Sequence, residues 1–143
     1  MANVDYRKEL NDLIDIVVSE KGSDIHLSVG AHPTVRVMGS LVPLVKKPVL
    51  TTEDVNGFCA VLLPESKKAN FSSLREVDFS YAVADHARFR GNAYYQQGTP
   101  AVALRHIPNE IRTLEELNLP PILASFTERP QGFFLSQHRT ARA

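Results

Sequence analysis

Apolar residues recur at helical spacing near the start of the chain and again after residue 50. The first set forms one stripe along a predicted helix: Tyr6, Leu10, Leu13, Ile14 and Val17. Asn3 or Asp5 can cap the start of this helix. A second helix follows the capping sequence that begins at Thr51, and its stripe consists of Val55, Phe58, Cys59, Leu62 and Leu63. Pro64 ends that helix and can begin another, which we expect to run through residues 67–74.

Elsewhere apolar and polar residues alternate with a period of two, which is typical of half-buried strands. The predicted strands cover residues 24–29, 35–38, 77–83, 89–97 and 101–107, and a further strand restarts at residue 41. Short turns at Asp85-His86 and Gly98-Thr99-Pro100 join the last three, so these strands should be antiparallel. Because the helices stand between groups of strands, the order predicts an α+β fold.

The pattern changes after the last predicted strand. Thr113 and Glu116 form a capping box, which predicts a short helix. Pro120-Pro121 then breaks the chain, and residues 122–126 can form one more helical turn. The run Gly132-Phe133-Phe134-Leu135 is apolar enough to be a strand, whereas residues 136–143 have no apolar period, and we expect that tail to be disordered.

Composition narrows the class of protein. The chain has 143 residues, of which 43% are hydrophobic and 22% charged, with a formal net charge of zero. These values favour a folded domain over disorder and argue against a broadly polybasic nucleic-acid-binding surface. The single cysteine, Cys59, excludes an internal disulfide and belongs to the apolar stripe of its helix, so we expect a buried structural thiol. No apolar run is long enough for a membrane span.

Charge is unevenly distributed along the chain. Residues 1–30 carry three basic and six acidic side chains, whereas residues 88–143 carry seven basic and four acidic ones. The basic last third is compatible with a local anion site, but ordinary surface scatter is the better explanation of the charge on its own.

Motifs of complete enzymes are missing from the sequence. It contains no phosphate loop ending in Gly-Lys-Ser/Thr, no dinucleotide fingerprint and no nucleophile elbow. Asp24, His26 and His32 could in principle gather around a metal ion, but their places on a strand face and in a turn disfavour this. The chain is therefore not expected to be an enzyme by its own residues.

The most informative stretch is the strand around Arg90. In an extended chain Arg88, Arg90, Asn92 and Tyr94 share one face. If this strand pairs with the next one through the Gly98 turn, Arg90 and Arg105 lie at the same end of the hairpin. Two guanidinium groups on a rigid sheet could bind a phosphate, because arginine donates hydrogen bonds in a planar fork and keeps its charge. The alternative is a solvated strand face with cross-strand pairs to acidic residues, and the residues alone leave both open.

A series of short motifs resembles the N-terminal domain of the type IV pilus retraction ATPases, the PilT branch of the secretion ATPase superfamily. The motifs stand in the order and spacing of that family: SDIHLS at 23–28, Pro33 with Arg36, Gly39 and Leu41, DFSY at 78–81, RFRGN at 88–92, QQG at 96–98, AVALR at 101–105 with Ile107-Pro108, and TLEEL at 113–117 with Leu119-Pro120. Each motif alone is weak, but the ordered series is specific.

The resemblance implies a PAS-like α+β domain, an antiparallel sheet with helices packed on one side, followed by a linker segment and a RecA-like ATPase core. In the family that core binds ATP and Mg²⁺, and the N-terminal domain lends arginines to the nucleotide. The matching positions are Arg90 and Arg105, which the resemblance implies as γ-phosphate contacts. Arg88 and Arg112 lie nearby in the sequence but match no family role, so their support is weaker.

The resemblance also implies a division of the chain. Residues 1–108 correspond to the PAS-like domain, residues 109–135 to the linker and the strand that leads into the phosphate loop, and residues 136–143 match nothing in the family. We interpret the chain as ending before the phosphate loop through a truncation, a tag or a shifted reading frame. Gly91 replaces a bulkier β-branched residue, which could loosen its strand.

The function implied is that of a regulatory, nucleotide-contacting domain of a hexameric motor for pilus retraction and twitching motility. Its partners would be its own ATPase core, the neighbouring subunits of a homo-hexamer and a pilus platform protein, in the cytoplasm beside the inner membrane. Nucleic acid and membrane insertion are not expected, and the chain alone should bind no cofactor. The alternative is a stand-alone PAS-like sensor or protein-interaction module.

Overall fold

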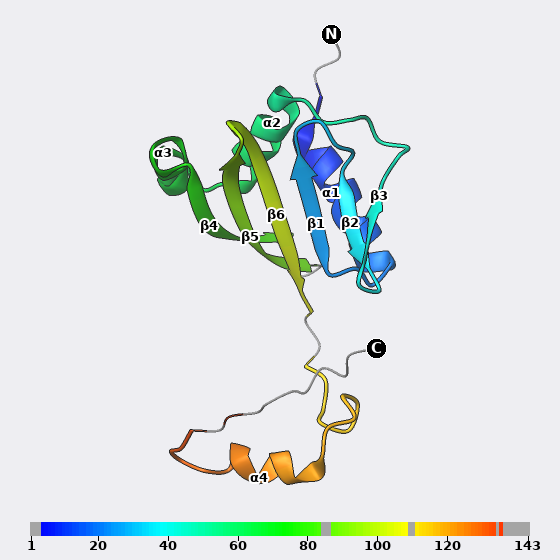
Figure 1. The fold of residues 1–143 in the computed structure, drawn as a ribbon, viewed down its shortest axis with the longest axis vertical. Coiled ribbons are helices and arrows are strands. Elements are labelled where there is room, and N and C mark those ends of the chain that lie inside the picture. The colour runs from blue at the N-terminus through cyan, green and yellow to red at the C-terminus, as the bar shows by residue number, and fades with distance from the viewer. Residues whose placement is uncertain (1–3, 84–86, 109–110, 134, 136–143) are drawn as a thin grey trace. The chain divides into compact units, whose positions relative to one another are not determined.

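A computed structural model describes residues 4–83, 87–108, 111–133 and 135 of the chain (Figure 1). The chain separates into two units, residues 1–109 and residues 110–143, and each is described by itself. The predicted turn at Asp85-His86, the alternative cap Asn3 and the tail at 136–143 lie outside the described residues. The three-part division of the chain stays a prediction.

The first unit is built on six strands that form one antiparallel sheet. Their order across the sheet is β3-β2-β1-β6-β5-β4. The strands are β1 (Asp24–Ser28), β2 (Thr34–Val37), β3 (Ser40–Pro43), β4 (Glu76–Val83), β5 (Ala87–Gln96) and β6 (Thr99–Ile107). The two strands in the middle of the sheet, β1 and β6, are the first and last strands along the chain, and about 75 residues separate them. Their pairing joins the group β1–β3 to the group β4–β6 in one sheet.

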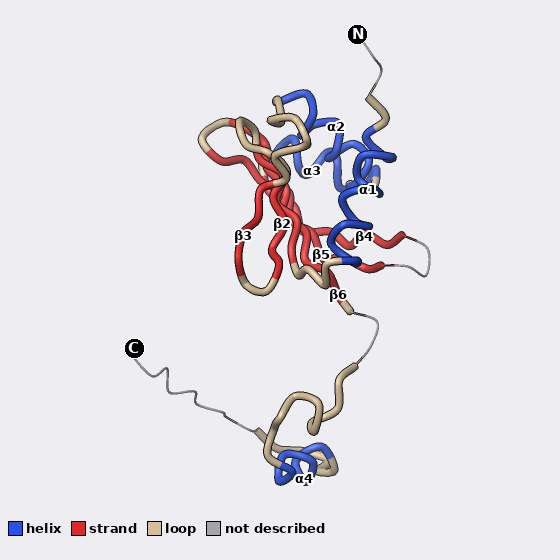
Figure 2. The backbone as a smooth tube through the Cα atoms, turned by 90° about the vertical axis from the view of Figure 1, so that its right-hand side faces the viewer, coloured by secondary structure: helices blue, strands red, loops and turns tan. Residues whose placement is uncertain are grey.

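Three helices cover one side of this sheet (Figure 2). They are α1 (Tyr6–Ser19), α2 (Thr52–Leu62) and α3 (Glu65–Leu74). Asp5 caps α1, and a reciprocal capping box between Thr51 and Asp54 begins α2. The predicted α+β class, with an antiparallel sheet and helices on one side, is confirmed.

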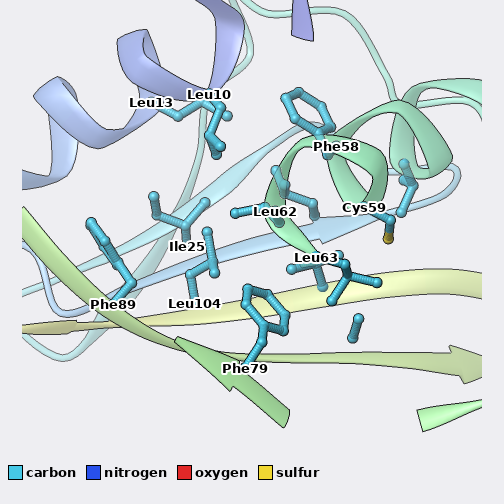
Figure 3. Close-up of a cluster of buried hydrophobic side chains, with 14 of the residues drawn as sticks. Leu10, Leu13, Ile25, Phe58, Cys59, Leu62, Leu63, Phe79, Phe89 and Leu104 are labelled. Carbon is cyan, nitrogen blue, oxygen red and sulfur yellow. The ribbon is translucent and has the colours of Figure 1, made fainter. Parts of the chain in front are cut away.

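The core lies between the helices and the covered face of the sheet (Figure 3). The predicted helical stripes supply one half of it, and the alternate strand residues supply the other, including Ile25, Phe79, Phe89 and Leu104. Cys59 is buried there, and burial raises the pKa of its thiol to about 11, so the thiol stays protonated at neutral pH. The predicted structural role of this cysteine is confirmed.

Two hairpin turns lie one residue away from their predicted positions. Met38-Gly39 and Gln97-Gly98 each form a turn in which both residues have positive φ: 48° and 82° in the first, 51° and 81° in the second. Such two-residue turns match the right-handed twist of the strands they connect. Met38 therefore belongs to a turn rather than to a strand, and Thr99 and Pro100 belong to β6.

In the second unit, the prediction of a helix after Thr113 is wrong. The capping box itself forms: the Thr113 amide donates to Glu116 Oε2 (2.8 Å) and the Glu116 amide donates to Thr113 Oγ1 (3.2 Å). Residues 114–118 nevertheless form turns, because so short a segment cannot offset the cost of starting a helix. A short 3-10 helix, η1 (Pro121–Leu123), and α4 (Ala124–Thr127) follow. The described residues of 132–135 are not in a strand.

Gly91 does not leave a gap in β5. The glycine lies directly opposite Phe79 on β4, and a Cβ atom built at Gly91 would come within 2.3 Å of the Phe79 ring. The aromatic ring therefore occupies the space that a side chain at position 91 would need. An exchange of volume between neighbouring strands explains the glycine better than a loosened strand does.

This packing predicts the effect of Gly91→Val. The added side chain must displace the Phe79 ring, so we expect the free energy of unfolding to fall by about 1–3 kcal/mol, the usual cost of overpacking a core. Adding Phe79→Leu to the same chain should recover part of the loss. Denaturant titration of the two variants measures both effects, and a Gly91→Val chain as stable as the original would contradict this account of the packing.

Candidate functional site

The sheet face opposite the helices carries a row of charged residues that crosses four of the six strands. The strand register places these residues side by side: Ser80 on β4, Arg90 on β5, Arg105 on β6, Asp24 on β1, Arg36 on β2 and Leu41 on β3. None of the three helices of the first unit covers this face (Figure 2). We call Arg90, Arg105, Asp24 and Arg36 the charged row.

Arg90 and Arg105 lie directly opposite each other in the β5–β6 ladder. Both are exposed, and their register puts both side chains on the open face. No hydrogen bond or ion pair joins the side chain of Arg90 to any residue in the described part of the chain. Arg105 donates from Nε to Asp24 Oδ1 (2.9 Å), while 75% of its side chain stays exposed. The pair thus combines one guanidinium without a partner among these residues and one that is tethered through Nε alone.

Asp24 is the buried carboxylate of the charged row. Its side chain is 8% exposed and accepts a hydrogen bond from Ser23 Oγ at Oδ2 (2.7 Å). Arg36 Nε lies 3.2 Å from the same oxygen, and Arg36 Nη1 donates to the Gly39 carbonyl (2.9 Å). Each carboxylate oxygen therefore faces one arginine.

Burial on its own would raise the pKa of Asp24. Hydrogen bonds from Ser23 and Arg105, together with the electrostatic effects of Arg105 and His26, outweigh this effect and hold the pKa below its usual value near 3.8. The carboxylate is therefore ionised at neutral pH and offsets part of the positive charge of the surrounding arginines.

A shallow depression of about 270 Å³ adjoins the charged row. Arg90, Arg105 and Asp24 border it, and Ala103 lies between His26 and Asn92 in the neighbouring row. His26 Nε2 is buried without a hydrogen-bond partner among the described residues. On the far side, Asn92 Nδ2 donates to Asp78 Oδ1 (3.1 Å), so this acid is held by an amide rather than by an arginine.

The directly opposed pair does not include the other candidate residues. Arg88 is on the same face of β5, opposite Ile107, and Arg112 belongs to the second unit. His32 Nδ1 lies 2.7 Å from the Lys47 carbonyl in a loop. Within the described ranges no three His, Cys, Asp or Glu side chains are close enough together to hold a metal ion. In the same ranges no helix has the length and apolar character that a membrane span requires.

Comparison with known sequences finds several relatives, three of which follow. Type IV pilus ATPase PilU of Pseudomonas aeruginosa is 31% identical over 127 residues, which cover 89% of this chain and 33% of PilU. Type IV pilus retractation ATPase PilT of the same organism is 30% identical over 89% of this chain and 37% of PilT. A twitching motility protein of Neisseria gonorrhoeae is 32% identical over 72% of this chain. The chain belongs to the PilT family. No protein-family model matches it.

Solved structures agree with this assignment. A crystal structure of the pilus retraction motor PilT with bound ADP superposes with a TM-score of 0.70 at 36% identity, covering 82% of this chain and 34% of that one. The ATPase DotB of Legionella pneumophila, at 20% identity and a TM-score of 0.61, shares the fold. The chain corresponds to the N-terminal domain of PilT-family proteins and spans about a third of the length of the PilU and PilT relatives.

Reasoning from the sequence missed the part that Asp24 and Arg36 play in the site. Both residues stand in the motifs that carry the PilT resemblance, but no role was assigned to them there. The open alternative of cross-strand pairs to acids describes Arg105, which pairs with Asp24, but not Arg90. One signal in the sequence could have indicated their part in the site. Asp24 lies on the polar face of a predicted strand, and two other predicted strands carry an arginine that could pair with it.

The lowered pKa of Asp24 predicts a pH-dependent contribution to stability. A carboxylate whose pKa is lowered by folding stabilises the folded state above its unfolded-state pKa and loses this contribution as the pH falls through the folded-state pKa. At pH 6, Asp24→Asn should lower the free energy of unfolding by about 1–3 kcal/mol, because Arg36 loses its buried partner.

Denaturant unfolding of both proteins from pH 6 down to pH 2 tests this prediction. The difference in stability between the original chain and Asp24→Asn should shrink as the pH falls below about 4 and the carboxylate takes up its proton. A difference that stays constant down to pH 2 would show that the contribution of Asp24 to stability does not depend on its charge.

Proposed function

We propose that the chain is the N-terminal domain of a pilus retraction motor and that Arg90 and Arg105 bind the γ-phosphate of ATP held by an ATPase core. The observation that carries the proposal is the direct pairing of the two arginines on a sheet face that no helix of the unit covers. The names of the PilU and PilT relatives support the motor class. Because the chain spans only a third of their length, ATP hydrolysis and motor activity are proposed for the longer protein.

The geometry of the pair fits an anionic ligand. A guanidinium presents five N–H donors in a plane, and Asp24 takes only the Nε donor of Arg105. The terminal nitrogens of Arg105 and the whole guanidinium of Arg90 are available to phosphate oxygens. Bringing two positive charges together on adjacent strands costs energy in the absence of an anion, and a phosphate repays that cost.

The remaining parts of the motor would come from outside this chain. ATP and Mg²⁺ would be bound by the ATPase core, which supplies the phosphate loop, and the core and the neighbouring subunits of a homo-hexamer would be the direct partners. A pilus platform protein would receive the movement, in the cytoplasm beside the inner membrane. Contacts of Arg90 and Arg105 that differ between nucleotide states would drive a rotation of the domain about residues 110–121.

A stand-alone sensor would need a ligand cavity between sheet and helices. In the first unit, a cluster of buried side chains lies between the sheet and the helices (Figure 3). The pocket that borders α1, α2 and residues 47–50 has a volume of about 190 Å³, below the roughly 300 Å³ at which small-molecule sites usually begin. The motor domain is therefore the function that the arrangement supports better.

Substitution of Arg90 tests the proposal in a protein that carries this domain together with its ATPase core. Arg90 has no partner among the described residues, so Arg90→Ala should leave the fold unchanged. We expect it to lower the ATP turnover number by about 10³-fold, the loss typical of removing an arginine that stabilises the transferring phosphate. Arg90→Lys should recover only part of the rate, because lysine lacks the planar fork.

Arg7→Ala is the matched control, because it removes an exposed arginine from the first turn of α1. It should turn over ATP at the original rate. Near-normal turnover in both Arg90→Ala and Arg105→Ala, with unchanged circular dichroism, would remove the pair from the nucleotide site.

A further inference from the structure

We propose that Asp24, held in place by Arg36, is a positioning residue that aims the guanidinium of Arg105 toward the side of Arg90. The tether itself is a property of this chain. Its purpose, to prepare a phosphate site, rests on the proposed function.

The first step of the argument is that Asp24 is itself immobilised. Its carboxylate is buried in the sheet face, and Ser23 Oγ and Arg36 Nε both bind Oδ2. Arg36 is anchored in turn by its hydrogen bond to the Gly39 carbonyl in the β2–β3 turn. Because Arg36 is held at two of its nitrogens, it fixes the carboxylate rather than offering itself to a ligand.

The second step concerns the freedom of Arg105. Three quarters of its side chain is exposed, so only the Nε–Asp24 hydrogen bond restrains it among the described residues. An exposed arginine without such a restraint loses side-chain entropy when a ligand orders it. A tether formed before the ligand arrives reduces that loss, which is the physical basis of preorganisation.

The third step concerns which donors the tether leaves free. Asp24 and Arg90 flank Arg105 on opposite sides, since β6 lies between β1 and β5. A bond from Nε to the β1 side leaves the two terminal nitrogens free. The negative charge of Asp24 also offsets part of the repulsion between Arg105 and Arg90 without occupying either terminal group.

Nuclear magnetic resonance of the arginine Nε–Hε groups in the 143-residue chain tests the tether directly. In the original chain the Arg105 Hε signal should be shifted from the position of a free arginine and protected from exchange with solvent. Asp24→Asn should move it to the free position and speed its exchange by about tenfold or more. An Arg105 signal unchanged by Asp24→Asn would overturn the proposal.

Asp78→Asn is the matched control. It removes the same charge from the same sheet face, but Asp78 binds the Asn92 amide and no described arginine. The Arg105 signal should stay as in the original chain. If Asp78→Asn released Arg105 as fully as Asp24→Asn does, a general effect of charge would explain the signal, and the tether would be rejected.

Titration of the same three proteins with inorganic phosphate separates positioning from simple electrostatics. Removing a negative charge beside an anion site should by itself strengthen phosphate binding in both variants. Positioning predicts instead that Asp24→Asn binds phosphate about three- to tenfold more weakly than the original chain, while Asp78→Asn binds it as tightly or more tightly. Stronger binding by Asp24→Asn would overturn the proposal.

The two claims can fail separately. If the original chain bound no phosphate but Asp24→Asn still released Arg105, the tether would stand and the anion role of the pair in the proposed function would fall. If Asp24→Asn does not fold, Arg36→Gln serves as the second variant, because Arg36 is partly exposed. Its loss should speed exchange of the Arg105 Hε by about threefold, and unchanged exchange would overturn the part assigned to Arg36.

Discussion

A buried carboxylate between two arginines determines how the open face of this sheet is arranged. Asp24 contacts Arg36 on one neighbouring strand and Arg105 on the other, and it is the one acidic member of the charged row. A buried charge without partners would be strongly unfavourable, so the position of Asp24 requires both arginines nearby. The motif residues Asp24 and Arg36, far apart in the sequence from Arg105, thereby become parts of one site.

That arrangement depends on a sheet with one covered face. The helices bury the residues that point to their side, and the alternation of side chains along each strand then puts Arg90, Arg105, Asp24 and Arg36 together on the other side. Because antiparallel pairing sets the register residue by residue, a shift of one position would bury these charges. The core and the charged row therefore fix the same register, which ties the stability of the domain to the geometry of its candidate site.

Local patterns were sufficient to predict the elements of the first unit. Helical stripes such as Leu10–Leu13–Val17 and the alternation around Phe89 indicate which side chains are buried, and this burial determined which segments form helices and which form strands. The positions of the turns were less predictable, because Met38 and Gln97 adopt positive φ although neither is a residue that favours it. The Thr113 capping box formed without its helix, since a cap stabilises a helix but does not supply the length that one needs.

The candidate site was predictable only in part, for a physical reason. Arg90 and Arg105 lie on two strands that a two-residue turn joins, so their pairing follows from sequence spacing. Asp24 reaches Arg105 through the pairing of β1 with β6, which lie some 75 residues apart, and no local pattern specifies that contact. Gly91 is a second example, because the reason for a glycine at this position is the Phe79 ring on the neighbouring strand, which no local pattern specifies.

The central claim is that the paired guanidiniums of Arg90 and Arg105 bind a phosphate that another part of the protein holds. The most direct measurement is a structure of a protein that carries this domain and its ATPase core, with a non-hydrolysable ATP analogue bound. The account predicts terminal nitrogens of both arginines about 3 Å from oxygens of the γ-phosphate, with Arg105 Nε still bound to Asp24. A γ-phosphate contacted by the core alone, with both arginines facing solvent, would contradict it.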